Sequence, residues 1–346
     1  MYRALRVGVL MVLFVAVAGM AWAGGSAEEE TITFTIQHNS SADHPWQDGL
    51  EFIADRMQEE FPGVFNVTIH DSGALADQQW EVILEQTQTN VVQMSIESFP
   101  PMATLVPELF ALSAPFMFDD MEHQLRFLED PDVQDMMAGW LEKMEERDLK
   151  TIAVWPRPPR QLLNSERPVI VPEDIRGLPF RVPSLDLFVR TFEALGAEPT
   201  PMPSGEIYTA MQLGTVVGED NAIGTVYDFG TYEQGQYFNV WNYMADGVLV
   251  NVNKQWFEET LTPEMQDALV AAAEDAAELV LELELEFQQY ARQQMEDFGI
   301  EFTDFDREMK EPWIELVEDG GIYDMLRNEI GDEDWNTLTR VADETR

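Results

Sequence analysis

Strand and helix periods alternate along the N-terminal part of the chain, and this alternation constrains the fold more than any other feature. Apolar side chains occupy every second position in residues 31–37 and 65–69, which is the period of a β-strand with one buried face. Residues 46–61, between them, carry apolar side chains at the spacing of an amphipathic helix. A second helical segment and a third predicted strand, residues 91–96, follow. This order predicts an α/β fold with a mainly parallel sheet flanked by helices.

Polar residues follow two of these predicted strands. His38 and Asn39 come directly after the first strand, and a predicted loop of residues 95–99, which contains Glu97, ends the third. Ligands of parallel sheets bind outside the carboxyl ends of the strands. We therefore expect His38, Asn39 and Glu97 to contact a ligand. For His38, the alternative is a turn histidine that bonds its own backbone.

Arginine is concentrated in one stretch of a strongly acidic chain. The chain has 20 Lys and Arg against 65 Asp and Glu, a net charge of -45. Residues 155–181 nevertheless contain Arg157, Arg160, Arg167, Arg176 and Arg181. An acidic chain repels anions and should bind one only where guanidinium groups gather, and each guanidinium fork matches a carboxylate. The stretch therefore predicts an anion site, with ordinary surface arginines paired to nearby acids as the alternative.

Six prolines in the same stretch predict its backbone shape. Proline fixes φ and lacks an amide donor, so it disfavours a helix interior and a central strand. We expect residues 155–160 to form an extended crossing between two domains, with a second crossing near residues 244–248.

Residues 1–23 have the composition of a secretory signal. Arg3 and Arg6 precede an apolar run, and Ala21-Trp22-Ala23 matches a cleavage site, so we expect cleavage after about Ala23 and a soluble periplasmic protein.

The mature chain would keep 18 basic and 65 acidic residues, which excludes nucleic acid as a partner. The absence of cysteine excludes disulfides and thiolate metal sites. We expect no metal and no cofactor, and we attribute the acidity to a solvated surface suited to a saline habitat.

The second half of the chain predicts another α/β unit and one very long helix. Strand and helix signals alternate again between about residues 156 and 246. Thr262-Pro263 then opens a helix that Gly299 ends, about 36 residues long or roughly 54 Å. Its middle alternates with period two, but Leu, Glu, Ala and Gln dominate and favour the helix. A helix of this length can span two domains.

Several motifs, in this order and spacing, resemble the DctP-type solute receptors of tripartite ATP-independent periplasmic (TRAP) transporters. The strongest are Asp174-Ile-Arg-Gly-Leu-Pro-Phe-Arg-Val-Pro183, Leu195-Gly-Ala-Glu-Pro-Thr-Pro-Met-Pro203, Glu206-Ile-Tyr-Thr-Ala-Met-Gln-Leu-Gly214 and Gly218-Glu-Asp-Asn221. The resemblance covers nearly the whole mature chain.

The resemblance implies a two-lobed periplasmic binding protein fold, type II-like, with a hinge and a long helix across both lobes. Lobe I would comprise residues 31–156 plus about 247–286, and lobe II about 157–246 plus 287–346. The family's carboxylate-binding arginine falls on Arg181, its upstream partner on Arg160 and its ligand-binding asparagine on Asn221. Ser204 stands where many members carry a cleft aromatic, which implies a wider or more polar pocket.

The function that this resemblance implies is capture of a small organic acid and delivery to a TRAP permease with a small and a large membrane subunit. Tyr208 is a further candidate ligand contact, with a core aromatic as the alternative. We expect a monomer without catalytic activity. Two other classes stay open: a secreted hydrolase using carboxylates such as Glu97 or Glu219, and the receptor of an ATP-driven importer. Dicarboxylates, sugar acids, keto acids and aromatic acids all remain possible ligands.

Overall fold

A computed structural model describes residues 31–346. The predicted signal peptide, residues 1–23, lies outside the described residues. Within residues 31–346, no helix is both long and apolar enough to cross a membrane.

The described residues form a nine-stranded sheet with the order β2-β1-β3-β8-β4-β7-β5-β6, and β9 pairs with β8. The strands are β1 Ile32–Gln37, β2 Phe65–His70, β3 Met94–Ser98, β4 Leu149–Asn164, β5 Pro179–Val182, β6 Glu198–Pro201, β7 Gly218–Asn221, β8 Tyr237–Asn253 and β9 Glu301–Asp304.

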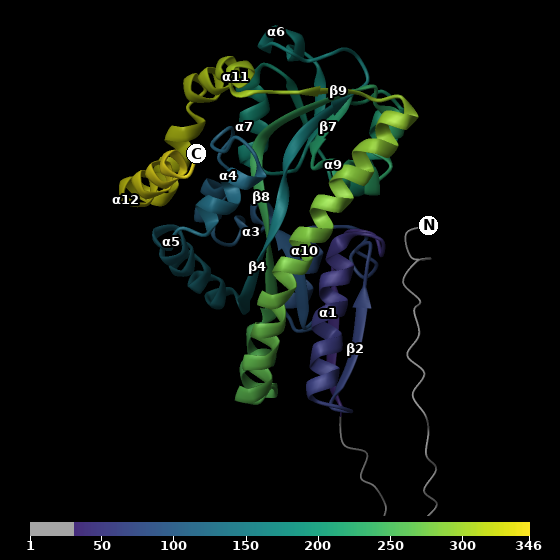
Figure 1. Cartoon of the computed structure of the whole chain (residues 1–346), viewed down its shortest axis with the longest axis vertical. Coiled ribbons are helices and arrows are strands. Elements are labelled where there is room, and N and C mark those ends of the chain that lie inside the picture. Colours follow the sequence, from purple (N-terminus) through teal and green to yellow (C-terminus); the bar gives the residue numbers. More distant parts are fainter. Residues whose placement is uncertain (1–30) are drawn as a thin grey trace, which may run out of the picture. The chain divides into compact units, whose positions relative to one another are not determined.

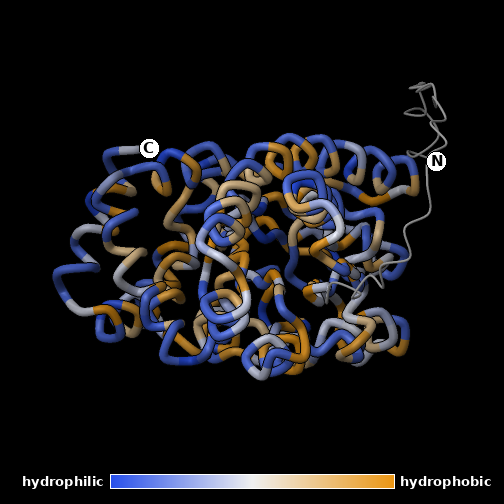
Figure 2. Tube along the Cα trace, turned by 90° about the horizontal axis from the view of Figure 1, so that it is seen from below, coloured by the Kyte–Doolittle hydropathy of each residue, from blue (hydrophilic) through white to orange (hydrophobic). Residues whose placement is uncertain are grey.

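Helices cover the sheet and lie at its ends (Figure 1). They are α1 Pro45–Glu60, α2 Trp80–Gln88, α3 Phe99–Met102, α4 Met121–Leu128, α5 Pro131–Leu141, α6 Pro172–Ile175, α7 Asp186–Leu195, α8 Ile207–Gln212, α9 Ile223–Asp228, α10 Pro263–Phe298, α11 Arg307–Asp319 and α12 Ile322–Glu344. Many of them carry both hydrophilic and hydrophobic residues within each turn, as helices with one buried face do (Figure 2).

Two groups of parallel strands point toward the same place on the sheet. The first group is β2, β1 and β3, and the second is β6, β5 and β7. Strand β3 runs antiparallel to β8 and ends where Ser98 pairs with Val248. Strand β7 runs antiparallel to β4 and ends where Asn221 pairs with Gln161. Because β4 and β8 also pair with each other, the carboxyl ends of both groups face the middle of the β4–β8 ladder.

The ladder of β4 and β8 corrects one prediction. The proline-rich residues 155–160 were expected outside any central strand, yet they lie inside β4, where they pair with β8. The register shifts between Arg157 and Arg160. Arg157 pairs with Asp246 and Arg160 with Met244, so β4 uses three residues over a distance for which β8 uses two. This is a β-bulge, a place where a sheet tolerates prolines because ladder hydrogen bonds are already interrupted. Residues 244–248, the second expected crossing, lie within one continuous extended strand, β8.

The end of the third predicted strand also differs from expectation. Residues 95–98 belong to β3, and Phe99 begins α3, so the predicted loop of residues 95–99 is wrong. Every residue of β3 is buried. A strand buried on both faces lacks the alternation by which its ends are recognised in a sequence.

Helix α10 packs on both strand groups. Thr262 accepts a hydrogen bond from the Met265 amide at its start, and Gly299 ends it in a left-handed conformation with φ 114°, which confirms the predicted bounds. Ala272 and Val280 pack in the core beside β1 and β3, whereas Ala291 and Met295 pack in a separate core beside α8 and α9. The helix therefore spans both halves of the described chain (Figure 1).

Candidate ligand-binding cleft

A cleft lies where the carboxyl ends of the two strand groups converge. Its cavity has a volume of about 80 Å³. One water needs about 10–15 Å³ of such space, so the cavity suits a small organic molecule. The lining includes six predicted site residues, which are Asn39, Glu97, Arg160, Arg181, Ser204 and Asn221. It also includes Trp46, Trp80, Arg157, Phe188 and Phe229.

The β-bulge brings two arginines to one face of the sheet. Arg157 and Arg160 are three residues apart, and in a regular strand this odd spacing would place them on opposite faces. The extra residue at the bulge restores a common face, and both guanidinium groups contact the buried carboxylate of Asp246. Arg160 also donates from Nε to Asp220 Oδ2 at 2.6 Å. Both arginines are thus neutralised by buried acids.

Arg181 differs from these two arginines in its partners. Its side chain is buried, and Nε and Nη2 both donate to the Met202 carbonyl, at 3.1 and 3.0 Å. Within residues 31–346, no carboxylate oxygen lies within salt-bridge distance of it. Burial lowers the pKa of Arg181, against the opposing effect of Asp220 and Glu219, but a guanidinium stays protonated in proteins. The unused N–H groups of Arg181 therefore offer a cation to the cleft.

Asn221 is held at the carboxyl end of β7 by charged neighbours. Its Oδ1 accepts from Arg157 Nη2 at 3.2 Å, and its Nδ2 donates to Glu219 Oε2 at 3.4 Å. Glu219 is fully buried, and the Thr231 hydroxyl donates to it. Burial raises the pKa of Glu219, although Arg181 opposes this rise. These bonds fix the amide of Asn221 beside the cavity.

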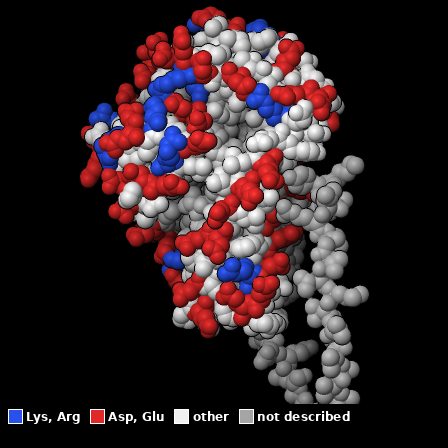
Figure 3. Space-filling view, in the orientation of Figure 1, with Lys and Arg blue, Asp and Glu red and all other residues white. Residues whose placement is uncertain are grey.

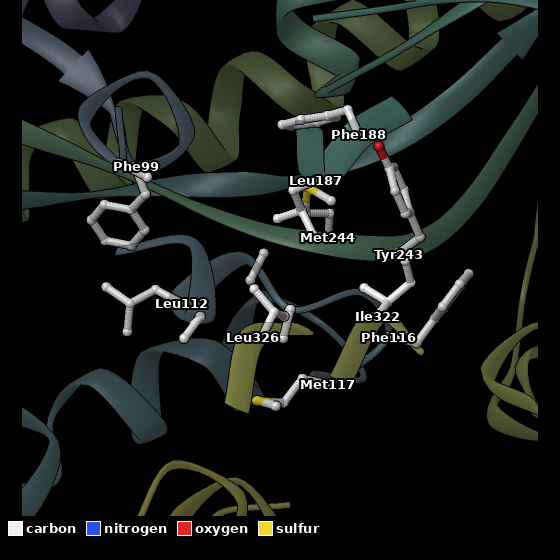
Figure 4. Packing of buried hydrophobic residues seen from close by; sticks show 14 of the residues in the cluster. Phe99, Leu112, Phe116, Met117, Leu187, Phe188, Tyr243, Met244, Ile322 and Leu326 are labelled. Carbon is white, nitrogen blue, oxygen red and sulfur yellow. The ribbon is translucent and has the colours of Figure 1, made fainter. Parts of the chain in front are cut away.

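Aromatic rings form the walls of the cleft. The Arg157 guanidinium lies 5.5 Å from the centre of the Trp46 ring, and the Arg160 guanidinium lies 5.0 Å from that of Phe188. Phe188 belongs to the large core that also contains Tyr243, whose hydroxyl points toward Phe188 (Figure 4). That hydroxyl donates to Asp220. The core therefore supports the arginine positions directly.

The model for bacterial extracellular solute-binding proteins of family 7, DctP, matches residues 36–320. The chain belongs to this family.

Named relatives support the assignment. The 2,3-diketo-L-gulonate-binding periplasmic protein YiaO of Escherichia coli is 29% identical over 254 residues, 73% of this chain and 75% of that protein. The C4-dicarboxylate-binding periplasmic protein DctP of Rhodobacter capsulatus is 27% identical over 308 residues, 88% of this chain and 89% of that protein. A TRAP periplasmic solute-binding protein from Bradyrhizobium sp. BTAi1, solved with galacturonate, is 26% identical, with a TM-score of 0.80 over 90% of this chain and all of that one. The predicted two-lobed α/β fold is confirmed.

Two predicted site residues of this solute-binding protein lie outside the cavity lining. His38 is fully buried, and its Nε2 lies 2.8 Å from Gln47 Oε1 in α1, which differs from the alternative of a turn histidine bonded to its own backbone. Burial lowers its pKa. Tyr208 is half-buried, and its hydroxyl donates to Glu233 at 2.8 Å. It lines a neighbouring cavity that shares Asn39 and Ser204 with the cleft.

Arg157 and the wall aromatics were not among the predicted site residues. Arg157 was visible as a member of the arginine-rich stretch, but its approach to the cleft depends on the bulge. Arg167 and Arg176 of the same stretch are ordinary surface arginines, which was the alternative to an anion site. At exposed positions, Arg167 donates to the Asp174 carbonyl and Arg176 approaches the Glu173 carboxylate. Within residues 31–346, no group of three or more His, Cys, Asp or Glu side chains is arranged to hold a metal ion.

Proposed function

We propose that this solute-binding protein captures a small organic acid in the cleft through its carboxylate and delivers it in the periplasm to a TRAP-type permease of two membrane subunits. The observation that carries the proposal is Arg181, a buried guanidinium that lines the cavity and has no ion pair among residues 31–346. A buried cation without an anionic partner is unfavourable, and an anionic ligand removes that penalty.

The other lining residues supply the remaining polar contacts of this proposal. Arg160 orients the ligand carboxylate or binds a second polar group, and Asn221 offers its amide. Asn39 and Ser204 bring further hydrogen-bonding groups to the cavity. His38 acts indirectly, since it precedes Asn39 and bonds α1, and Tyr208 lies in the adjacent cavity.

The relatives indicate the chemical range of the ligand. One is named for a diketo sugar acid, one for C4-dicarboxylates, and one was solved with a uronate. All are carboxylates, which agrees with the free guanidinium of the cleft. We propose that the protein works as a monomeric receptor that returns its ligand chemically unchanged.

Calorimetry with a panel of sugar acids and dicarboxylates tests the role of Arg181. Arg181→Ala should weaken binding by about 2–5 kcal/mol, the range for truncating one partner of a buried charge pair. Arg181→Lys should restore only part of this loss, because one ammonium cannot reproduce the guanidinium fork.

Arg176→Ala is the matched control, since Arg176 lies in the same stretch at an exposed position. It should bind as the parent does. Unchanged affinity in Arg181→Ala would remove Arg181 from the site. If no acid of the panel binds the parent, or if one is recovered chemically altered, the proposed function is wrong.

A further inference from the structure

Ser41 and Asp228 join the two strand groups beside the cleft. Ser41 lies in the loop after β1, and Asp228 is the last residue of α9, which follows β7. One carboxylate oxygen of Asp228 accepts a hydrogen bond from the Ser41 amide at 3.1 Å, and the other accepts one from the Ser41 hydroxyl. The two residues are 187 positions apart in the sequence. We call this pair the Ser41–Asp228 clasp.

The clasp adjoins the cleft without forming its wall. Ser40 precedes Ser41, Phe229 follows Asp228, and both of these neighbours line the cleft. Among the described residues, the cleft lining includes neither clasp residue. Ser41 and Asp228 instead line the adjacent cavity, which shares Asn39 and Phe229 with the cleft. The clasp therefore fixes how far the two sides of the cleft lie from each other.

The clasp lies away from the place where the lobes are expected to hinge. Strand β3 separates β1 from the β4–β8 ladder, whereas α9 follows β7, which borders β4 on the other side. Bending at the bulge would move the loop after β1 relative to α9. The bonds of the clasp run outside the continuous strands, so they have to break when the two strand groups separate.

The outer edges of the two strand groups also meet. Gln78 lies in the loop after β2, and Gly205 follows β6, and these two strands are the ends of the sheet. A Cβ atom on Gly205 would lie 2.8 Å from Gln78 Oε1. The groups thus touch at the side farthest from the β4–β8 ladder. The structure therefore describes a closed arrangement, and the clasp belongs to it.

The chemistry of the clasp makes it strong enough to matter. Both residues are half-buried, which limits competition from water. A hydrogen bond to an ionised carboxylate is roughly twice as strong as one between neutral groups, and Asp228 accepts two. Bonds that form only in the closed arrangement stabilise it against the open one. This stabilisation does not depend on which ligand is bound.

We propose that the Ser41–Asp228 clasp holds the cleft closed and sets how long a ligand stays bound, without contacting the ligand. A ligand enters while the strand groups are apart, and its release requires the clasp to break. Loss of the clasp should therefore raise the dissociation rate constant and leave the association rate constant unchanged. The inference rests on the proposed function, because an acid bound in the cleft reports the state of the clasp.

Stopped-flow fluorescence of the mature chain at pH 7 tests the inference, with Trp46 and Trp80 of the cleft lining as reporters. The ligands are D-galacturonate, D-galactonate and succinate. For each acid that binds the parent, Asp228→Ala should raise the dissociation rate constant about tenfold and change the association rate constant by less than about twofold. Asp228→Asn keeps one acceptor oxygen and should give an intermediate rate.

Ser41→Ala removes the hydroxyl but keeps the backbone amide. It should speed dissociation less than Asp228→Ala does. The double variant should release ligand no faster than Asp228→Ala alone, because the clasp is already lost and the two effects are not additive. Asp43→Asn is the matched control, since it removes an exposed acid of the same loop. It should keep both rate constants within about twofold of the parent.

The outcomes separate this inference from the proposed function. An unchanged dissociation rate in Asp228→Ala overturns the inference, even where Arg181→Ala abolishes binding and the proposed function stands. Additive effects of the two single variants also overturn it, as does an acceleration that differs strongly between acids, because Asp228 would then contact the ligand. If none of the three acids binds the parent, the proposed function and this inference fail together.

Discussion

At the scale of single residues, the cleft depends on acids that neutralise its arginines. Asp246 is fully buried and contacts Arg157 and Arg160 at once, and its backbone pairs with Arg157 across the ladder. Asp220 likewise accepts hydrogen bonds from both Arg160 and the Tyr243 hydroxyl. Burial alone would lower the pKa of Arg160, but Asp220 and Asp246 outweigh it and raise that pKa. Among the described arginines of the cleft, these acids leave Arg181 as the one without an ion pair.

Removing the charge of Asp246 should destabilise the ligand-free protein strongly. Asp246→Asn leaves Arg157 buried without its main partner, and breaking a buried pair on one side lowers the free energy of unfolding by about 3–5 kcal/mol. Urea denaturation followed by tryptophan fluorescence measures this change. Asp186→Asn is the control, because Asp186 pairs with Arg190 at an exposed position and should change stability by less than about 1 kcal/mol. Equal stability of both variants would show that Asp246 does not compensate the arginines.

At the scale of elements, a glycine sets how closely α3 approaches the β4–β8 ladder. A Cβ atom on Gly247 would lie 2.3 Å from the end of the Phe99 ring, and Phe99 is fully buried. Gly247 pairs with Pro156 in the ladder, beside the arginine-bearing bulge. Phe99 opens α3 directly after Glu97 and Ser98. Close packing here therefore positions the carboxyl end of β3 against the cleft.

Gly247→Ala should overpack this contact and lower the free energy of unfolding by about 1–3 kcal/mol. Adding Phe99→Leu should restore part of the loss, because the two residues are in contact and their effects are not additive. Gly139→Ala in α5 is the control, since a Cβ atom there meets nothing within 4 Å. It should leave the protein as stable or up to about 1 kcal/mol more stable. A double variant no more stable than Gly247→Ala would place the strain elsewhere.

At the scale of the whole molecule, the two lobes share continuous elements. Strands β4 and β8 run through both strand groups, and α10 packs on both cores (Figure 1). Acidic side chains gather along α10 on the face shown in Figure 3, where solvent surrounds them. The cleft lies at the β-bulge, where the ladder is interrupted and bending is easiest. We expect the lobes to hinge there as rigid bodies, with α10 limiting the opening.

Ligand binding should therefore favour a closed form. A ligand in the cleft would contact residues of both strand groups, so it should bind the closed form more tightly and shift the population toward it. Small-angle X-ray scattering of the parent should show a smaller radius of gyration with saturating ligand. Arg181→Ala at the same ligand concentration should keep the profile of the ligand-free parent. An unchanged profile of the saturated parent would indicate a preformed, rigid pocket.

The sequence by itself determined the features that depend on neighbouring residues. Thr262-Pro263 and Gly299 determine the ends of α10 through local hydrogen bonds and backbone conformation. The motifs around Arg181 and Asn221 indicate the family, because their order and spacing can be read directly from the sequence. The predicted lobe boundaries and the predicted roles of the site residues stay predictions.

Only the tertiary structure decided how the charges of the cleft are paired. Asp246 lies 89 residues from Arg157, and Asp220 lies 60 residues from Arg160. No local period specifies such partners, because they depend on the strand register and on a bulge that turns Arg157 and Arg160 to one face. The same long-range pairing buries Glu97 and leaves its Oε1 atom without a hydrogen-bond partner in the described part of the chain. Burial removes water as an alternative partner for these groups. What the cleft can bind therefore depends on how each charge is paired, and the presence of the charge in the sequence does not show this.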